Sequence, residues 1–450
     1  MTARRKKRRL KKSVRRGCLC VLVAVMFFVL FTVYECFREP KEPEVPELDL
    51  VLGPDSVDEV LHRALGDLLR NPGRVDTNHL ALSVYDLQQH CFVCQHNSNR
   101  LMPPASCMKL LTAINALHCL GTEHQYESQL SMQGTVSNGV LNGYLVLTMD
   151  DDPLIEDFSR FVNALSRMGL RTIRGGIYFD LTRRDTLRPH PSAPYWDMPY
   201  HSLPLLFKGE PFVKKQFLYA LAESGIQLEH NVLFGNPWAE EMQDRENCPE
   251  RYVAMNGARV GTQVVAREVH NLRDVLAPML IFSSNTKAEA VFYHIGHCLT
   301  RWTGGSTDGT EMAEWFIREE LPDMASSGFV LNDGSGLSPQ NRLTADFLVR
   351  LLNYAFQHED IRQVLIDEAL ATPGDGPRRG SLQGRMRDPI FLGRVFCKTG
   401  TLTTIGVSSL SGYCRGNDGR WYAFSVISQE TPVAESRIFQ DALCRTLVRH

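Results

Sequence analysis

Three short motifs place serine, lysine, asparagine and threonine at spacings suited to covalent catalysis. The first is an S-x-x-K formed by Ser106 and Lys109, directly after Pro103-Pro104-Ala105, where proline favours the start of a helix. Residues three apart project from the same side of a helix, so the lysine is expected beside the serine. A serine hydroxyl is a weak nucleophile without an adjacent base, and a lysine in a dry pocket loses its charge and becomes one. The pair therefore predicts acyl transfer through Ser106, with Lys109 as the base.

Two further motifs complete a set that one active site could use. Ser283-Ser284-Asn285 is the only S-x-N in the sequence, and it stands between two helical patterns, where a loop can present both polar side chains. Lys398-Thr399-Gly400 is the only K-T-G, and it ends a strand-like run. A glycine on a strand edge permits the close approach of another backbone. S-x-x-K, S-x-N and K-T-G in this order are the signature of penicillin-binding proteins and serine β-lactamases.

Each motif has a structural explanation when it is taken alone. Ser284 and Lys287 form a second S-x-x-K, which shows how readily this spacing arises by chance. Ser283 and Asn285 could simply cap a helix, and Lys398 could be an exposed strand residue. Because all three motifs occur in order and in suitable contexts, we interpret them as one site.

From about Leu80 to the C-terminus the chain resembles peptidase family S13, the class C low-molecular-weight penicillin-binding proteins that act as D-alanyl-D-alanine carboxypeptidases and endopeptidases. The resemblance rests on the stretches PPASCMKLLTAINAL, NGVLNGYLVL, LAPMLIFSSNTKAEAVFYHIG, NDGSGLSPQNRLTA and CKTGTLTTIGVSSLSGYCRGNDGRWYAFSV. The 173 residues between Lys109 and Ser283 fit the large insertion of that family. The chain departs from the family pattern at Asp151, at Ile281-Phe282 and at Ser284, and these departures concern substrate preference more than the fold.

The resemblance implies an α/β serine-transpeptidase fold, like that of penicillin-binding proteins and β-lactamases. We expect an antiparallel sheet, made of the C-terminal strands and a hairpin over 79–95, with helices flanking it. A helical subdomain would carry Ser283 and Asn285, and an inserted lobe would follow the first motif.

The resemblance also implies a role for each motif residue. In the expected catalytic set, Ser106 forms the acyl-enzyme, Lys109 takes its proton, Ser283 relays a proton to the leaving amine and Asn285 holds the substrate amide. Lys398 completes this set by binding the terminal carboxylate of the substrate.

The expected substrate-binding residues follow Lys398 directly, and they are Thr399, Gly400 and Thr401. Thr399 would bind the terminal carboxylate, and the backbone N–H groups of Ser106 and Thr401 would form the oxyanion hole. Peptidoglycan peptides and β-lactams are the implied ligands, and no metal or organic cofactor is needed.

Two other functions share these features. A serine β-lactamase needs a deacylating group such as the glutamate of E-x-x-L-N, and the sequence contains no such pattern. A non-catalytic relative that binds wall peptides remains compatible with the unusual stretch at 281–285. For a peptidase, cleavage of D-Ala-D-Ala termini and of D-Ala cross-links are both compatible with the motifs.

The N-terminus predicts a membrane anchor. Residues 1–16 hold ten basic residues and no acidic one, which leaves 39 basic and 51 acidic residues in the rest of the chain. A folded part with this excess of acidic residues is poorly suited to binding nucleic acid, whose phosphates are negatively charged. Residues 17–34 carry no charge and would span about 27 Å as a helix. No small-residue cleavage site follows, so we expect an uncleaved single-pass anchor over 17–36, with the later residues outside the cytoplasm.

The remaining organisation is expected as follows. A Pro-rich linker covers 37–55, the catalytic domain combines 56–133 with 269–450, and an accessory lobe occupies 134–268. Helical patterns occur near 57–69, 104–119, 155–168, 270–282, 286–300, 309–320, 343–357, 360–370 and 433–448. Strand patterns occur at 79–95, 143–149, 174–180, 393–399, 405–414 and 420–428, and 181–250 has weak periodicity.

Cysteine and histidine pairs suggest metal sites only weakly. Cys91 and Cys94 form a C-x-x-C without a second pair at zinc spacing, so we interpret them as part of the hairpin. His294, His297 and Cys298 lie on an apolar helical run, and we expect packing residues there rather than ligands.

Overall fold

The computed structural model describes residues 59–194, 197–229, 232–234, 262–303 and 309–450. The expected basic tail (1–16), membrane anchor (17–36) and linker (37–55) lie outside these residues, so their assignments stay predictions. Among the described residues, no helix is both long and apolar enough to cross a membrane.

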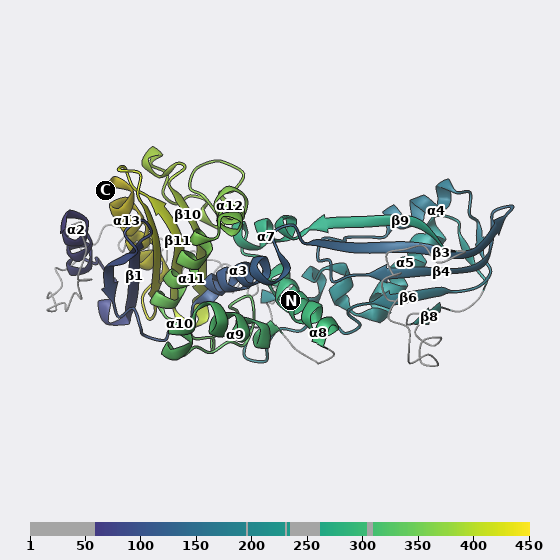
Figure 1. The fold of residues 1–450 in the computed structure, drawn as a ribbon, viewed down its shortest axis with the longest axis horizontal. Coiled ribbons are helices and arrows are strands. Elements are labelled where there is room, and N and C mark those ends of the chain that lie inside the picture. Colours follow the sequence, from purple (N-terminus) through teal and green to yellow (C-terminus); the bar gives the residue numbers. More distant parts are fainter. Residues whose placement is uncertain (1–58, 195–196, 230–231, 235–261, 304–308) are drawn as a thin grey trace, which may run out of the picture. The chain divides into compact units, whose positions relative to one another are not determined.

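A five-stranded sheet combines the hairpin near the N-terminal motif with the C-terminal strands (Figure 1). All of its pairs are antiparallel, in the order β10-β11-β12-β1-β2. Its strands are β1 (Leu80–Asp86), β2 (Cys91–His96), β10 (Val395–Leu402), β11 (Val407–Arg415) and β12 (Trp421–Ser428). The expected α/β fold with an antiparallel sheet is therefore confirmed.

Helices cover both faces of this sheet. Side chains alternate between the faces of a strand, and β1 shows it: Leu82 and Val84 pack in one core, whereas Ala81 and Tyr85 pack in another. The first core includes α2 (Glu59–Arg70) and α13 (Val433–Arg449). The second core lies against α3 (Met108–Leu120) and α11 (Ala345–Gln357). All of β1 is buried and most of its residues are apolar, with Ser83 and Asp86 as the exceptions.

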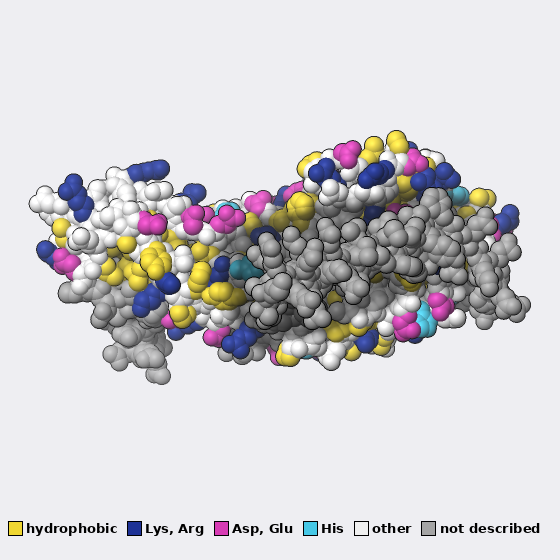
Figure 2. Space-filling view, turned by 180° about the vertical axis from the view of Figure 1, so that it is seen from behind, with side chains coloured by type: hydrophobic (Ala, Val, Ile, Leu, Met, Phe, Trp, Pro, Cys, Tyr) yellow, Lys and Arg dark blue, Asp and Glu magenta, His cyan; other side chains and the backbone are white. Residues whose placement is uncertain are grey.

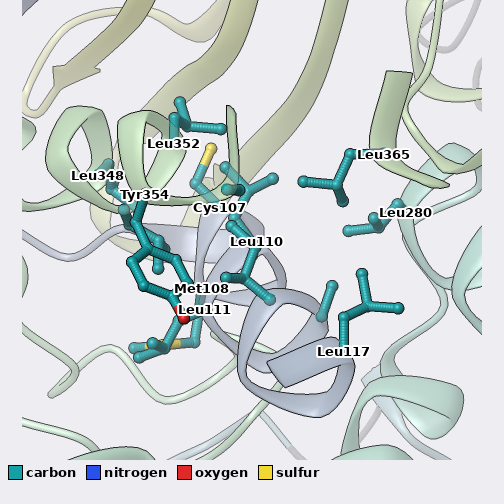
Figure 3. Close-up of a cluster of buried hydrophobic side chains, with 14 of the residues drawn as sticks. Cys107, Met108, Leu110, Leu111, Leu117, Leu280, Leu348, Leu352, Tyr354 and Leu365 are labelled. Carbon is teal, nitrogen blue, oxygen red and sulfur yellow. The ribbon is translucent and has the colours of Figure 1, made fainter. Parts of the chain in front are cut away.

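The second core is the larger and centres on α3, the helix after Ser106. Figure 3 shows Leu110, Leu111 and Leu117 of α3 surrounded by Leu280, Leu348 and Leu365 from other helices. The helical elements of this region are η2 (Ala105–Cys107), α3 (Met108–Leu120), α7 (Leu272–Ile281), α8 (Asn285–Thr303), α9 (Gly309–Glu320), α10 (Pro322–Ser327), α11 (Ala345–Gln357), α12 (Glu359–Gln363) and η8 (Val364–Ala369). The helix expected at 360–370 is thus α12 followed by the wider turn of η8.

Caps define where two of these helices begin. Asn271 and Asp274 form a capping box at the start of α7, and Thr344 Oγ1 accepts a hydrogen bond from Phe347 N at the start of α11.

A second sheet is inserted between α3 and α7. Its order is β7-β5-β4-β3-β9, with β6 beside β4 and β8 beside β6. The elements are β3 (Gln125–Ser137), β4 (Val140–Met149), α4 (Ser159–Arg167), β5 (Thr172–Ile173), β6 (Ile177–Leu181), α5 (Glu210–Glu223), β7 (Gln227–Leu228), β8 (Val232–Phe234) and β9 (Thr262–Asn271). Its own core includes Phe161 of α4 and Phe217 of α5. The expected lobe limits at 134 and 268 fall inside β3 and β9, so strands of this sheet extend beyond both limits.

The described surface carries charges of both signs. On the face in Figure 2, Lys and Arg side chains are interspersed with Asp and Glu side chains and with apolar ones.

No disulfide joins any two of the eight described cysteines. Cys91 and Cys94 lie on β2 as expected, and Cys94 is buried.

Candidate active site

The S-x-x-K motif lies at the start of the buried helix α3. Ser106 belongs to the short turn η2, and Lys109 is in the first turn of α3. The helical spacing brings Lys109 Nζ to 2.9 Å from Ser106 Oγ. This is hydrogen-bond distance, so the hydroxyl has a potential base directly beside it.

Lys109 is completely buried and its ammonium is surrounded by oxygen acceptors. Besides Ser106 Oγ, Nζ lies 2.8 Å from Asn285 Oδ1 and 2.6 Å from the carbonyl oxygen of Ser335. An ammonium has three donors, and three oxygens meet them. The first and second motifs are therefore joined through one nitrogen.

Burial lowers the pKa of Lys109 well below the ordinary value of 10.5, and the positive charge of Lys398 lowers it further. A lysine in this state gives up its proton far more readily than an exposed one. Asp333 and Glu289 act in the opposite direction, but the net effect makes the Lys109 proton easier to lose, and the neutral amine is the form that can accept the proton of Ser106.

Lys398 joins the third motif to the second. Its Nζ lies 2.8 Å from Ser283 Oγ and 2.6 Å from the carbonyl oxygen of Thr399. Burial lowers the pKa of Lys398 to about 8, so it still carries its charge at neutral pH. Two buried lysines with lowered pKa values therefore contact the S-x-N loop, Lys109 at Asn285 and Lys398 at Ser283.

Close backbone packing holds β10 against the turn that carries Ser106. A Cβ added to Gly400 would lie 2.2 Å from Ser409 Oγ and 3.0 Å from Pro104 O, so glycine is required for this contact. Ser409 Oγ donates to Pro104 O over 2.7 Å. Ala105 has a φ of 48°, a conformation that non-glycine residues rarely adopt, and the turn is kept in it by these contacts.

The outer edge of β10 offers backbone groups to a ligand. Within the sheet β10 pairs only with β11, and Cys397 N on the other edge bonds to Ala371 O. Backbone groups of alternate strand residues point to the same edge, so those of Thr399 and Thr401 point there as well. Thr399 and Thr401 are half-buried, whereas Gly400 is buried between the strand and the turn.

The second S-x-x-K does not form a comparable pair. Lys287 Nζ approaches Pro153 O at 3.5 Å, and Ser284 Oγ contacts Thr286 Oγ1 and the backbone N of Lys287 instead. The Ser284 hydroxyl therefore contacts the first residues of α8, and no lysine base lies beside it among the described residues.

A buried acidic pair behind Lys109 was missed in the sequence. Glu289 Oε1 accepts from Ser335 N over 2.9 Å, and Asp333 accepts from the backbone N of Gly336 and of Ser338. These bonds shape the loop whose Ser335 carbonyl contacts Lys109. Burial, and then the charge of Asp333, raise the pKa of Glu289 to about 7. The stretch NDGSGLS (332–338), which contains Asp333 and Ser335, was the available signal in the sequence. The contact of the Ser335 carbonyl oxygen with Lys109 could not be predicted from it, because every residue has a backbone carbonyl.

One protein-family model matches most of the chain. The model of the D-Ala-D-Ala carboxypeptidase 3 (S13) family matches residues 61–204 and 250–449. A curated relative, the D-alanyl-D-alanine carboxypeptidase of Actinomadura sp. (strain R39), is 26% identical over 423 residues, which cover 77% of each chain.

Solved structures agree on the fold. Penicillin binding protein 4 (dacB) from Haemophilus influenzae superposes with a TM-score of 0.66 at 18% identity, covering 86% of this chain and 99% of the other. The same protein complexed with a β-lactam gives a TM-score of 0.62, with the same identity and coverage. The endopeptidase Bd3459 of Bdellovibrio bacteriovorus, in complex with an immunity protein, gives 0.52 at 16% identity, covering 82% and 93%.

Proposed function

The chain belongs to the D-Ala-D-Ala carboxypeptidase 3 (S13) family of serine-type peptidases, and on that premise we propose that it is a DD-peptidase of peptidoglycan that works through an acyl-enzyme on Ser106. The observation that carries the proposal is the 2.9 Å contact between Ser106 Oγ and the fully buried Lys109 Nζ. The substrates are D-Ala-D-Ala termini, D-Ala cross-links, or both.

Acylation begins with a proton transfer. Neutral Lys109 takes the proton of Ser106 Oγ as the oxygen attacks the carbonyl carbon of the penultimate D-Ala. The carbonyl oxygen becomes an oxyanion, which the N–H groups of Ser106 and Thr401 stabilise. Each such donor contributes about 3 kcal/mol to the transition state.

The leaving group then departs as an amine. The C–N bond breaks, and the nitrogen receives a proton from Ser283 Oγ. Ser283 Oγ in turn receives the proton that Lys109 took from Ser106, so Lys109 is neutral again before deacylation. Lys398 supports Ser283 through their 2.8 Å bond and, with Thr399, binds the carboxylate of the leaving D-Ala. In deacylation, water attacks the ester while Lys109 takes its proton, and Ser106 is released with its hydrogen.

The free edge of β10 supports the way in which a peptide would bind. An extended peptide can add to an open sheet edge through main-chain hydrogen bonds. The backbone groups of Thr399 and Thr401 are the ones available for this pairing. Such a pose brings the scissile carbonyl toward Ser106, because Gly400 packs on the turn that carries it.

β-Lactams imitate this substrate and would acylate the same serine. The Haemophilus influenzae relative is known in a complex with a β-lactam, which supports the expectation for this chain. The proposed location is the extracytoplasmic face of the cytoplasmic membrane, through the apolar segment 17–36.

The proposal is tested with purified protein, a fluorescent penicillin and isolated muropeptide monomers and dimers. Wild-type protein is expected to be labelled and to release D-Ala from monomers or monomers from dimers. Ser106→Ala is expected to lose both reactions, whereas the matched control Ser284→Ala keeps them. A folded wild-type protein that neither labels nor cleaves would instead be a wall-peptide-binding protein.

A further inference from the structure

Three side chains with metal-binding atoms meet where α8 passes the start of the second sheet. His294 Nε2 lies 2.9 Å from His124 Nε2 and 3.3 Å from Cys298 Sγ. The three atoms all lie within 4.8 Å of one another. His124 comes just before β3, and the other two residues are one turn apart on α8. The cluster is separate from Ser106, Lys109 and Lys398, none of which contributes to it.

Hydrogen bonds alone do not explain this arrangement. A histidine Nε2 has either one N–H or one lone pair, both in the ring plane, so it makes one good hydrogen bond. His294 Nε2 nevertheless faces both His124 Nε2 and Cys298 Sγ at contact distance. A cation placed between the three atoms would give each of them a partner.

The spacing suits a tetrahedral ion. Zinc lies about 2.0–2.1 Å from histidine nitrogen and about 2.3 Å from cysteine sulfur, so tetrahedral ligands are separated by about 3.3–3.6 Å. The two short separations in the cluster, 2.9 and 3.3 Å, are within a few tenths of an ångström of that range. The third pair, His124 Nε2 and Cys298 Sγ, lies within 4.8 Å, so side-chain rotations that spread the two short separations and close this one would seat the ion.

The backbone holds the donors in place. His294 and Cys298 are four residues apart on one helix, which places them on one face. The carbonyl oxygen of His124 accepts from Leu272 N over 2.9 Å, which ties it to the start of α7. His294 is 1% exposed, whereas His124 and Cys298 are half-buried, so one side of the cluster remains open to a water ligand.

Carboxylates surround the cluster as they surround many histidine-ligated metals. His294 Nδ1 lies 3.8 Å from Asp151 Oδ2 and 3.8 Å from Asp150 Oδ1. An acid behind the ring favours the tautomer with a proton on Nδ1 and leaves Nε2 free for a metal. Asp151 is 1% exposed; its Oδ2 is hydrogen-bonded to His297 Nδ1, and its Oδ1 has no hydrogen-bond partner within the described part of the chain. This carboxylate, which lies between His297 and the His294 ring, adds negative charge beside the cluster.

We propose that His124 Nε2, His294 Nε2 and Cys298 Sγ bind a divalent zinc ion, with water as the fourth ligand. Two imidazoles and a thiolate are the donor set that favours zinc over harder cations. Binding displaces the thiol proton of Cys298. The ion would join α8, which begins at Asn285, to the turn that follows α3. The proposal does not depend on the peptidase activity.

The test uses full-length protein purified in detergent, stripped with a chelator and titrated with Co²⁺ as a spectroscopic probe for Zn²⁺. We expect one tightly bound ion, visible-region bands of a tetrahedral site, a near-ultraviolet band from sulfur to cobalt, and displacement by Zn²⁺. Cys298→Ser is expected to lose the sulfur band and to weaken binding at least about tenfold. The control Cys91→Ser, at a half-buried thiol of the other sheet, is expected to match wild type.

A second variant separates ligation from simple loss of folding. Asp151→Asn is expected to keep the sulfur band and to lower the affinity about ten- to a hundredfold, because it acts through His294. Zinc is also expected to raise the Tm of wild type and not that of Cys298→Ser. A stripped, folded wild-type protein without the sulfur band, or a band that Cys298→Ser retains, would overturn the proposal.

Discussion

Lys398 Nζ lies 2.8 Å from Ser283 Oγ, and this contact joins two motifs that are 115 residues apart in the sequence. Ser283 has a φ of 60°, in the left-handed region, so the loop holds this residue in a backbone conformation that serine seldom adopts. The contact gives Ser283 Oγ a charged donor on one side and leaves its own proton available to a leaving group. The proton relay proposed for Ser283 depends on this geometry.

Removal of the Ser283 hydroxyl is expected to slow the chemistry without unfolding the protein. Ser283→Ala should lower the rate of penicillin acylation by about 10²–10⁴-fold, the usual contribution of a positioned proton donor. Ser284→Ala is the matched control, because its hydroxyl contacts the helix start instead. The rate constants come from stopped-flow mixing with a reporter β-lactam. Equal rates for the two variants would remove Ser283 from the relay.

The charge of Lys398 is expected to produce the alkaline limb of the pH profile. Because burial lowers the pKa of Lys398 to about 8, its positive charge is lost as the pH rises through that value. Peptides with a free terminal carboxylate should then bind more weakly, so KM rises above pH 8 while kcat changes less. Lys398→Arg keeps its charge and should move the limb to higher pH. If the alkaline limb stays at the same pH in Lys398→Arg, a group other than Lys398 causes it.

Glu289 is expected to make the protein less stable as the pH rises toward neutrality. Its pKa is raised from 4.5 to about 7, first by burial and then by Asp333, so the folded state holds a proton that the unfolded state has lost. Between these two values the free energy of unfolding therefore falls with rising pH. Glu289→Gln should flatten that slope in thermal melts from pH 4.5 to 7. A slope as steep as in wild type would contradict the assignment.

Gly400 is expected to tolerate no side chain. In Gly400→Ala the added Cβ would lie 2.2 Å from Ser409 Oγ and 3.0 Å from Ala105 Cβ, which pushes β10 away from the nucleophile turn. Overpacking of this kind costs about 1–3 kcal/mol, and acylation should slow as well. Gly376→Ala is the control, because a Cβ there meets nothing within 4 Å. Denaturant unfolding gives the free energy of unfolding of both variants. Equal values would show that β10 can move away from the turn at little cost, which would contradict the prediction.

The segment 17–36 is expected to keep the protein in the membrane. Full-length protein should remain with membranes after a high-salt wash and retain its N-terminal residues, because no small-residue cleavage site follows the apolar run. A soluble form that begins near residue 37 would identify the segment as a cleaved signal peptide instead.

Elements with strong residue patterns could be predicted, and weakly patterned ones could not. Strands β1 and β12 are mostly apolar, and the structure has the hairpin over β1 and β2 and the C-terminal strands near the expected positions. Strands β3 and β9 were missed because their alternation is broken: β3 buries Ser128 and Ser131, and β9 exposes Val264 and Val269. Helix α5 was missed in 181–250, where proline and charged residues hide a weak periodicity.

The motif residues could be found because catalysis restricts their side chains, and the structure brings Ser106, Lys109 and Asn285 together around one nitrogen. The Ser335 contact to Lys109 could not be predicted, because its carbonyl group is common to every residue. His124 lies 170 residues from His294, so no local spacing linked them.

The most direct test of the central claim is the position of the covalent adduct. Protein acylated with benzylpenicillin is digested with trypsin, and the modified peptide is sequenced by mass spectrometry. Ser106 should carry the penicilloyl group, because Lys109 Nζ lies 2.9 Å from its hydroxyl. An adduct on Ser284, the serine of the second S-x-x-K, would contradict the account.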